Sequence, residues 1–277
     1  MAISKPSRAT SMPALQPASA PVGVKWRDTH TLRLIVIPLT IAAIIALWEL
    51  LVRARNLPPF ILPSPSDVWA RLFTAIQTAS FWGHVGVTLI EVAGGLLIGG
   101  SLALAMGYVV AKSRLLSSIL SPIIVASQAI PIVAVAPLLA IWFGYGLAPK
   151  IVTSTLIVFF PILISVAAGI RAIEPNLRDL MRSLQASRRQ MFFKLEVPAA
   201  LPMVFSGLRV GATLSVIGAI VGEFVNSDRG LGFLIKQGNG EYDTARTFVA
   251  LFALVSIALI LYGSVALIER RALAWKR

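Results

Sequence analysis

The sequence predicts an all-α polytopic membrane protein with six transmembrane helices and both termini in the cytoplasm. Hydrophobic residues make up 57% of the 277 residues and charged residues only 13%, which is too apolar for a soluble domain of this length. Six apolar stretches each reach about 20 residues, the length that crosses a bilayer. The 25 basic residues outnumber the 12 acidic ones, and they gather in alternate loops, as the positive-inside rule expects.

This one-sided distribution indicates topology rather than a nucleic-acid surface, so no nucleic-acid partner is expected. The absence of cysteine excludes disulfides and thiolate metal sites. Residues 1–33 are rich in Ser, Ala and Pro and lack apolar periodicity, so we expect a disordered cytoplasmic tail there. A cleaved signal peptide is not expected, because the apolar stretch that begins at Leu34 is long enough to span and no small-residue cleavage site follows it.

The six apolar stretches are the predicted spans: Leu34–Val52, Thr88–Val110, Ile119–Phe143, Ile151–Ile170, Met203–Gly222 and Thr247–Ile268. With the N-terminus inside, most Lys and Arg residues fall in the inner segments. Arg209 sits near the inner end of a span, where its side chain can reach the interface. The even number of spans then places the basic segment 171–203 and the basic tail 269–277 in the cytoplasm as well.

The first outer loop predicts a short amphipathic helix at the membrane interface. Ser66 is the expected N-cap, and apolar residues follow it near helical spacing. Simple interfacial packing is sufficient to explain this helix. The apolar residues are Val68, Trp69, Leu72, Phe73 and Ile76.

The second span carries small residues every four positions, so they share one helix face: Gly95, Gly99, Ala103 and Gly107. Small residues let helix backbones approach closely within lipid. Glu91 extends this face by one step and should therefore meet protein rather than lipid. It could line a substrate route or make a structural hydrogen bond to a neighbouring helix.

The third span contains Pro122, Pro131 and Pro137, and proline kinks or breaks a helix. Freed backbone groups at membrane depth require protein or a water-filled cavity beside them. The span is therefore either a bent, pore-lining helix that presents Gln128 or a bent helix that is fully packed. Glu223, at the outer end of the fifth span, is a further path candidate or an ordinary interfacial carboxylate.

Segment 171–203 predicts two short helices. Pro175 suits a first helical turn, and an apolar face follows at i, i+3, i+4 and i+7, formed by Leu177, Leu180, Met181 and Leu184. Ser187 and Gln190 have capping-box spacing, so the second helix should begin there and end before Pro198. The pair could lie on anionic head groups or dock onto a partner.

The stretch 178–187, followed by Leu195-Glu196-Val197-Pro198, resembles the cytoplasmic EAA motif of ABC importer permeases. In that motif, E-A-A is followed by three residues, G, nine residues and I-x-L-P. Asp179, Leu180 and Met181 stand at the E-A-A positions, and Gln185 replaces the glycine. Because that glycine usually forms a left-handed C-cap, either the turn differs here or neighbouring contacts offset about 1 kcal/mol of strain.

The resemblance covers roughly residues 34–277 and is closest to the nitrate/sulfonate/taurine branch of these permeases. Its further motifs are Ile61–Ser66, Ile130–Leu138, Trp142–Gly146, Gly222–Phe224, Gly230–Gly232 and Glu269–Arg271. It implies a type I ABC importer permease fold in a bacterial inner membrane. The implied domains are the first span with its outer amphipathic loop at 34–80 and an ABC transmembrane type-1 domain at 81–268.

The resemblance also implies partners and site residues. Two permease copies, most simply a homodimer, would form the path; an extracytoplasmic solute-binding protein would deliver substrate; and a cytoplasmic ABC ATPase dimer would bind ATP and Mg. The implied ATPase-coupling residues are Asp179, Leu180, Met181, Leu184, Gln185, Ala186 and Ser187. Path candidates are Gln128, Glu223 and Glu91.

No catalytic residue, metal site or cofactor is expected in this chain. It lacks a phosphate-binding loop and hydrolase motifs, and its two histidines, His30 and His84, lie far apart. A secondary transporter or a structural membrane subunit remains the alternative, although no internal repeat supports the former. The segments 143–150 and 221–225 look most like members that import pyrimidine-type vitamin precursors or riboflavin, with sulfonate, taurine and nitrate also possible.

Overall fold

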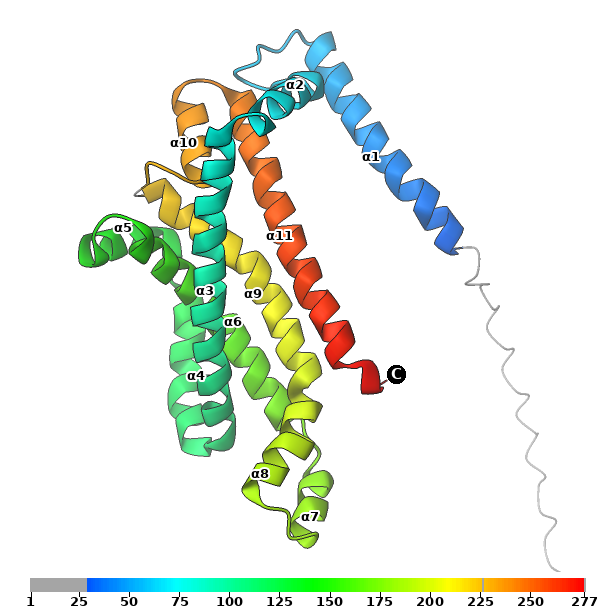
Figure 1. The fold of residues 1–277 in the computed structure, drawn as a ribbon, viewed down its shortest axis with the longest axis vertical. Coiled ribbons are helices and arrows are strands. Elements are labelled where there is room, and N and C mark those ends of the chain that lie inside the picture. Colours follow the sequence, from blue (N-terminus) through cyan, green and yellow to red (C-terminus); the bar gives the residue numbers. More distant parts are fainter. Residues whose placement is uncertain (1–28, 226, 277) are drawn as a thin grey trace, which may run out of the picture. The chain divides into compact units, whose positions relative to one another are not determined.

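A computed structural model describes residues 29–225 and 227–276, and the regular elements of this part of the chain are all helices (Figure 1). The described residues divide into two units, with the boundary between Leu47 and Trp48. Helix α1 spans Thr29–Ala54, so residues 29–33, which we assigned to the tail, are helical. The remainder of that predicted tail, residues 1–28, lies outside the described residues.

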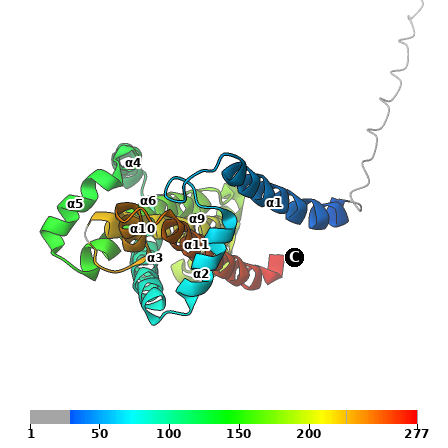
Figure 2. The same ribbon diagram turned by 90° about the horizontal axis from the view of Figure 1, so that it is seen from above.

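The second unit is built on α3, α6 and α9, which run beside one another (Figures 1 and 2). Near one end lie α2 and α10, and near the other lie α7 and α8. The elements after α1 are α2 (Pro65–Ile76), α3 (Ala79–Lys112), α4 (Arg114–Ala129), α5 (Ile132–Phe143), α6 (Leu147–Arg171), α7 (Pro175–Ser183), α8 (Arg188–Gln190), the π-helical η1 (Met191–Glu196), α9 (Val197–Val225), α10 (Leu231–Gly240), α11 (Thr244–Ala272) and the short 3₁₀ helix η2 (Ala274–Lys276).

The span prediction is confirmed. Among the described residues, five helices are long and apolar enough to cross a membrane, and α4 with α5 supplies a sixth, broken span. The two parts of that span meet at an angle of 96°. The break falls at Ile130 and Pro131, which have extended backbone conformations, because proline cannot supply the backbone hydrogen bond that would continue α4. Pro122 and Pro137 lie inside α4 and α5.

The small-residue face of α3 packs directly on α6. A Cβ atom added to Gly99 would lie 2.8 Å from the carbonyl oxygen of Thr155, and one added to Gly107 would lie 2.8 Å from the Cβ of Val166. Backbone-to-backbone packing of this kind needs residues without bulky side chains. The predicted close approach is thus confirmed, and α6 is its partner.

The N-cap of α2 is Ser64, so the prediction of Ser66 was wrong. Ser64 accepts a hydrogen bond from the Asp67 backbone N–H at 3.2 Å, and Asp67 accepts one from the Ser64 N–H at 3.3 Å. Pro65 occupies the first helical position, where its missing N–H is not needed. Ser66 instead donates its hydroxyl to Glu49 at 3.0 Å. Ser64 and Asp67 have the spacing of a capping box, which the sequence already contains, and the predicted N-cap was two residues too late.

Candidate functional site

Helix α7 presents an apolar face that the rest of the described chain leaves uncovered. It begins at Pro175 as predicted, and Leu177, Leu180 and Leu184 are 41%, 54% and 68% exposed. Asp179, Gln185 and Ser187 are also exposed, whereas Met181 and Ala186 are half-buried. The seven predicted coupling residues therefore lie together on α7 and the turn that follows it.

The turn after α7 keeps the left-handed geometry that the family's glycine would supply. Gln185 has φ of +52°. Its N–H donates to the Arg182 carbonyl at 2.9 Å, and the Ala186 N–H donates to the Met181 carbonyl at 3.0 Å. These two bonds form a Schellman motif. Of the two alternatives left open by the sequence, the structure shows that the turn does not differ: Gln185 adopts the left-handed conformation in place of a glycine.

The second helix begins at Ser187 as predicted, but it does not end before Pro198. Ser187 accepts from the Gln190 N–H at 3.2 Å, and Gln190 accepts from the Ser187 N–H at 2.8 Å. The helix continues through η1 into α9, giving one helix from Arg188 to Val225. A proline ring normally crowds the carbonyl four residues earlier, and the wider π-helical turns of η1 immediately before Pro198 provide the room.

Two arginine side chains make hydrogen bonds where α6 leads into α7. Arg178 donates to the Ile170 carbonyl at 2.5 Å. Arg171, the last residue of α6, donates to the Val110 carbonyl at 3.1 Å and to the Ser117 hydroxyl at 2.6 Å. The Arg178 bond joins α7 to the end of α6, and the Arg171 bonds join α6 to the end of α3 and to α4; the two carbonyl groups near the helix ends are thereby satisfied.

The broken span borders a mostly apolar cleft of about 490 Å³, and Gln128 is one of the polar residues that line it. Its wall comes from α4, α5, α6 and α9 and includes Ser127, Gln128, Ile130, Phe160, Pro161 and Ile217. Gln128 is exposed. The third span is thus bent and borders a cleft, and its role as a pore-lining helix stays a prediction.

Glu91 and Glu223 lie in a different place, within a buried polar cluster near the α10 end of the bundle. Both side chains are fully buried, and Lys150 is 3% exposed. The Lys150 ammonium lies 3.0 Å from a Glu91 carboxylate oxygen. Thr88 donates its hydroxyl to Glu223 at 2.6 Å, and the Gly232 N–H also donates to Glu223.

Glu223 is therefore not the interfacial carboxylate that we considered, and neither Glu91 nor Glu223 lines the Gln128 cleft. The sequence reasoning also missed Lys150 and Thr88. Lys150 follows the turn that contains Gly144 and Gly146, and it lies between the third and fourth predicted spans, so the predicted topology places it in an outer loop. Its burial depends on α3 and α9 packing around the first turns of α6, and no local pattern in the sequence reports such packing.

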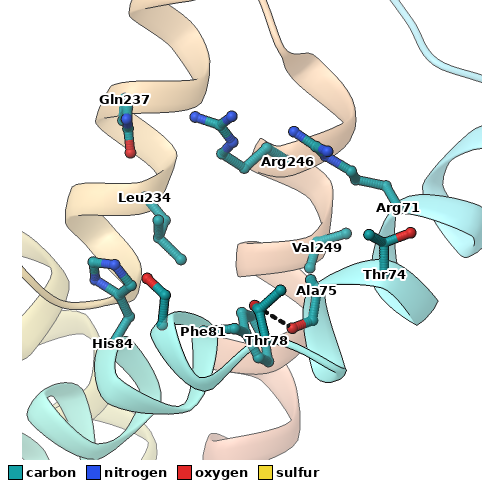
Figure 3. Close-up of a pocket in the computed structure, with 11 residues that line it drawn as sticks. Arg71, Thr74, Ala75, Thr78, Phe81, His84, Leu234, Gln237, Arg246 and Val249 are labelled. Atoms are coloured by element: carbon teal, nitrogen blue, oxygen red, sulfur yellow. Dashed lines mark hydrogen bonds between the residues drawn. The ribbon is translucent and has the colours of Figure 1, made fainter.

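A second pocket, of about 300 Å³, opens between α2, α3, α10 and α11 (Figure 3). Arg71 and Arg246 border it, and both pair with Asp243. Burial alone would raise the pKa of Asp243, but hydrogen bonds from the Arg246 N–H and from Arg71 hold that pKa below its usual value. Hydrogen bonds from Gln237 and Arg246 likewise lower the pKa of Glu241.

No cluster of three or more metal-ligating side chains occurs among the residues that the structure describes.

These features define an integral membrane transport subunit, and comparison with known proteins specifies its family. The sequence model of the binding-protein-dependent transport system inner membrane component matches residues 95–273, and the chain belongs to this family. The chain is thus a permease component of an ABC importer and a multi-pass inner-membrane protein. The family predicted from the EAA-like segment is confirmed.

Several relatives match over most of their length. A probable ABC transporter permease protein of Haemophilus influenzae is 40% identical over 84% of this chain and 95% of its own length. The riboflavin transport system permease protein RibX of Chloroflexus aurantiacus is 41% identical, covering 87% of this chain and 90% of the relative. The formylaminopyrimidine transport permease protein ThiX of Halalkalibacterium halodurans is 29% identical, covering 84% and 93%.

A solved structure supports the fold. An inward-facing conformation of the MetNI methionine ABC transporter superposes with a TM-score of 0.60 and 22% sequence identity. The match covers 68% of this chain and 94% of that chain. The chain therefore has the type I importer permease fold predicted from its sequence.

Proposed function

We propose that two copies of this chain form the translocation path of an ATP-driven importer, and that α7 docks onto a cytoplasmic ABC ATPase dimer. The observation that carries this proposal is the exposed apolar face of α7, held at one end of the bundle by a hydrogen-bonded turn. An amphipathic helix of this kind fits a groove in a partner. The partner ATPase binds ATP and Mg and performs the hydrolysis, and this chain is non-catalytic.

The helix that follows the turn gives the proposal a mechanical basis. Residues Arg188–Val225 form one continuous helix of 38 residues. A displacement of α7 by the closing ATPase would therefore reach the fifth span as a rigid-body movement. Because α9 borders the Gln128 cleft through Ile217, the same movement would alter that cleft.

We propose Gln128 as a lining residue of the substrate path, since it is exposed in the cleft. For Glu91 and Glu223 the buried cluster supports the structural alternative. Their polar atoms face Lys150, Thr88 and Gly232, and a charge buried among helices requires such partners.

We propose a small polar organic solute, delivered by an extracytoplasmic binding protein, as the substrate. A pyrimidine-type vitamin precursor or riboflavin is favoured because RibX and ThiX carry those names. Permeases named for aliphatic sulfonates and taurine, each 28% identical, support the alternative. Stabilisation of the cognate binding protein against thermal unfolding by riboflavin, a formylaminopyrimidine or taurine would distinguish them.

The docking proposal is tested by the double variant Leu180→Glu, Leu184→Glu. Two carboxylates on the apolar face should abolish co-purification of the partner ABC ATPase, because each charge would have to be desolvated in the groove. Uptake should be lost, while the permease still accumulates in membranes.

The matched control is Trp69→Glu, Phe73→Glu, which adds the same charges to exposed apolar residues of α2. This variant should retain the ATPase. Normal ATPase co-purification with the α7 variant would overturn the docking role, and uptake that persists without the ATPase would support the secondary-transporter alternative.

A further inference from the structure

We propose that Glu196 is a positioning residue that couples movement of α7 to α3, in addition to the direct route through α9. This proposal rests on the docking function of α7. Glu196 is the last residue of the π-helical segment η1 and is only 1% exposed. A buried carboxylate is retained only with partners, and its partners both come from α3.

Glu196 attaches η1 to the end of α3 through a compact group of side chains. It is paired with the Lys112 ammonium and accepts a hydrogen bond from the Tyr108 hydroxyl at 3.0 Å. Phe192, one turn earlier in η1, packs edge-to-face on the Tyr108 ring with centroids 5.1 Å apart. The Lys112 ammonium also lies 5.5 Å from the Tyr108 ring centroid.

On one side, this attachment leads to α7. The capping box at Ser187 begins the helix directly after the α7 turn, and η1 continues that helix without a break. The Val197 N–H donates to the Phe192 carbonyl, which is a π-type bond across five residues. Wide turns of this kind often occur where a helix must adjust for function.

On the other side, the attachment leads to the cleft. Helix α3 is locked to α6 by the close contacts of Gly99 and Gly107, so the two helices should move as a unit. Helix α6 supplies Phe160 and Pro161 to the wall of the Gln128 cleft. Glu196 therefore links α7, through α3 and α6, to the part of the cleft wall that α6 forms. Helix α9 forms another part of that wall.

The test uses the complete importer, with both permease copies and the ATPase, in lipid nanodiscs. The chain has no cysteine, so spin labels can be placed by Ser183→Cys on α7 or Met106→Cys on α3. Distances between the labels of the two copies are measured by pulsed electron paramagnetic resonance, without nucleotide and after trapping with ATP and vanadate. Both labelled pairs should shift in the otherwise unchanged protein.

In Glu196→Gln the ATPase should still co-purify and the α7 shift should persist, but the α3 shift should become smaller. Part of the shift remains, because Arg178 still joins α7 to α6 and α6 stays packed on α3. Gln leaves the half-exposed Lys112 free to reach solvent, so the change spares the fold. Tyr108→Phe keeps the ring contact with Phe192 and removes the hydroxyl, and it should reduce the α3 shift. The control Glu269→Gln removes a carboxylate that lies 3.3 Å from Arg209 on α9 and should leave both shifts intact.

An α3 shift of full size in Glu196→Gln would overturn the coupling role, as would the same reduction of the shift in Glu269→Gln. A loss of the α7 shift with the ATPase still bound would also overturn it, because Glu196 would then support α7 itself. Failure of the ATPase to bind the otherwise unchanged permease would refute the proposed docking function instead.

Discussion

At the scale of single residues, the turn after α7 holds a glutamine in a conformation that glycine adopts more readily. Gln185 has φ of +52° and no special side-chain interaction is needed for the two backbone bonds that close the turn. The geometry therefore comes from the Schellman motif, and the side chain at this position adds strain.

Gln185→Gly should stabilise the protein by about 0.5–1 kcal/mol, because it removes this strain. The measurement is thermal unfolding of the purified permease in detergent. Ser183→Gly, at the last residue of α7, is the control and should destabilise by about 0.5–1 kcal/mol. An unchanged or lower midpoint for Gln185→Gly would contradict the strain argument.

The ion pairs around Asp243 predict acid sensitivity of the pocket between α2 and α11. A folded-state pKa below the usual 3.8 means that the stabilisation is present above that usual value and is lost as pH falls through the folded pKa. The unfolding midpoint should therefore drop as the pH falls below 3.8.

Asp243→Asn should be less stable than the unchanged protein at neutral pH and should show a smaller drop on acidification, since it has no carboxylate to protonate at this position. The measurement is the thermal unfolding midpoint of each protein as a function of pH. If the midpoints of both proteins fall equally on acidification, Asp243 does not contribute to acid sensitivity.

At the scale of elements, the contact between α3 and α6 is a close packing constraint. Gly99→Ala should destabilise by about 1–3 kcal/mol, because the added carbon would lie 2.8 Å from the Thr155 carbonyl oxygen and the helices would have to separate. Gly83→Ala in the same helix meets nothing within 4 Å and should stabilise by up to about 1 kcal/mol. Thermal unfolding of the two variants compares them directly, and equal midpoints would argue against close packing.

The elements also show what local sequence reasoning can predict. Apolar runs predicted the spans, the three prolines predicted a bend in the third one without fixing its position, and the spacing of Ser187 and Gln190 predicted a helix start. Pro198 misled the prediction, because the rule that proline ends a helix assumes α-helical turns. The π-helical segment before Pro198 has no comparably clear signal in the sequence.

At the scale of the whole molecule, resemblance predicted the family and the fold, and periodicity predicted the exposed face of α7. The cluster of Glu91, Lys150 and Glu223 could not be predicted, since its members are distant in sequence and meet only when α3, α6 and α9 pack together. The same is true of Glu196 and its partners on α3. Buried polar side chains find their hydrogen-bond and ion-pair partners on neighbouring helices of the folded protein, and neither hydrophobic periodicity nor composition specifies which helices become neighbours.

The length of the helix from Arg188 to Val225 also bears on whether α7 could rest on lipid. At 1.5 Å per residue, its 38 residues reach about 57 Å, whereas the hydrocarbon core is about 30 Å thick. Even with a tilt of about 40°, the helix covers about 44 Å along the membrane normal, which is about 14 Å more than that core. A helix whose far end lies at the opposite face of the core would therefore carry α7 past the acyl chains, to the level of the head groups or beyond.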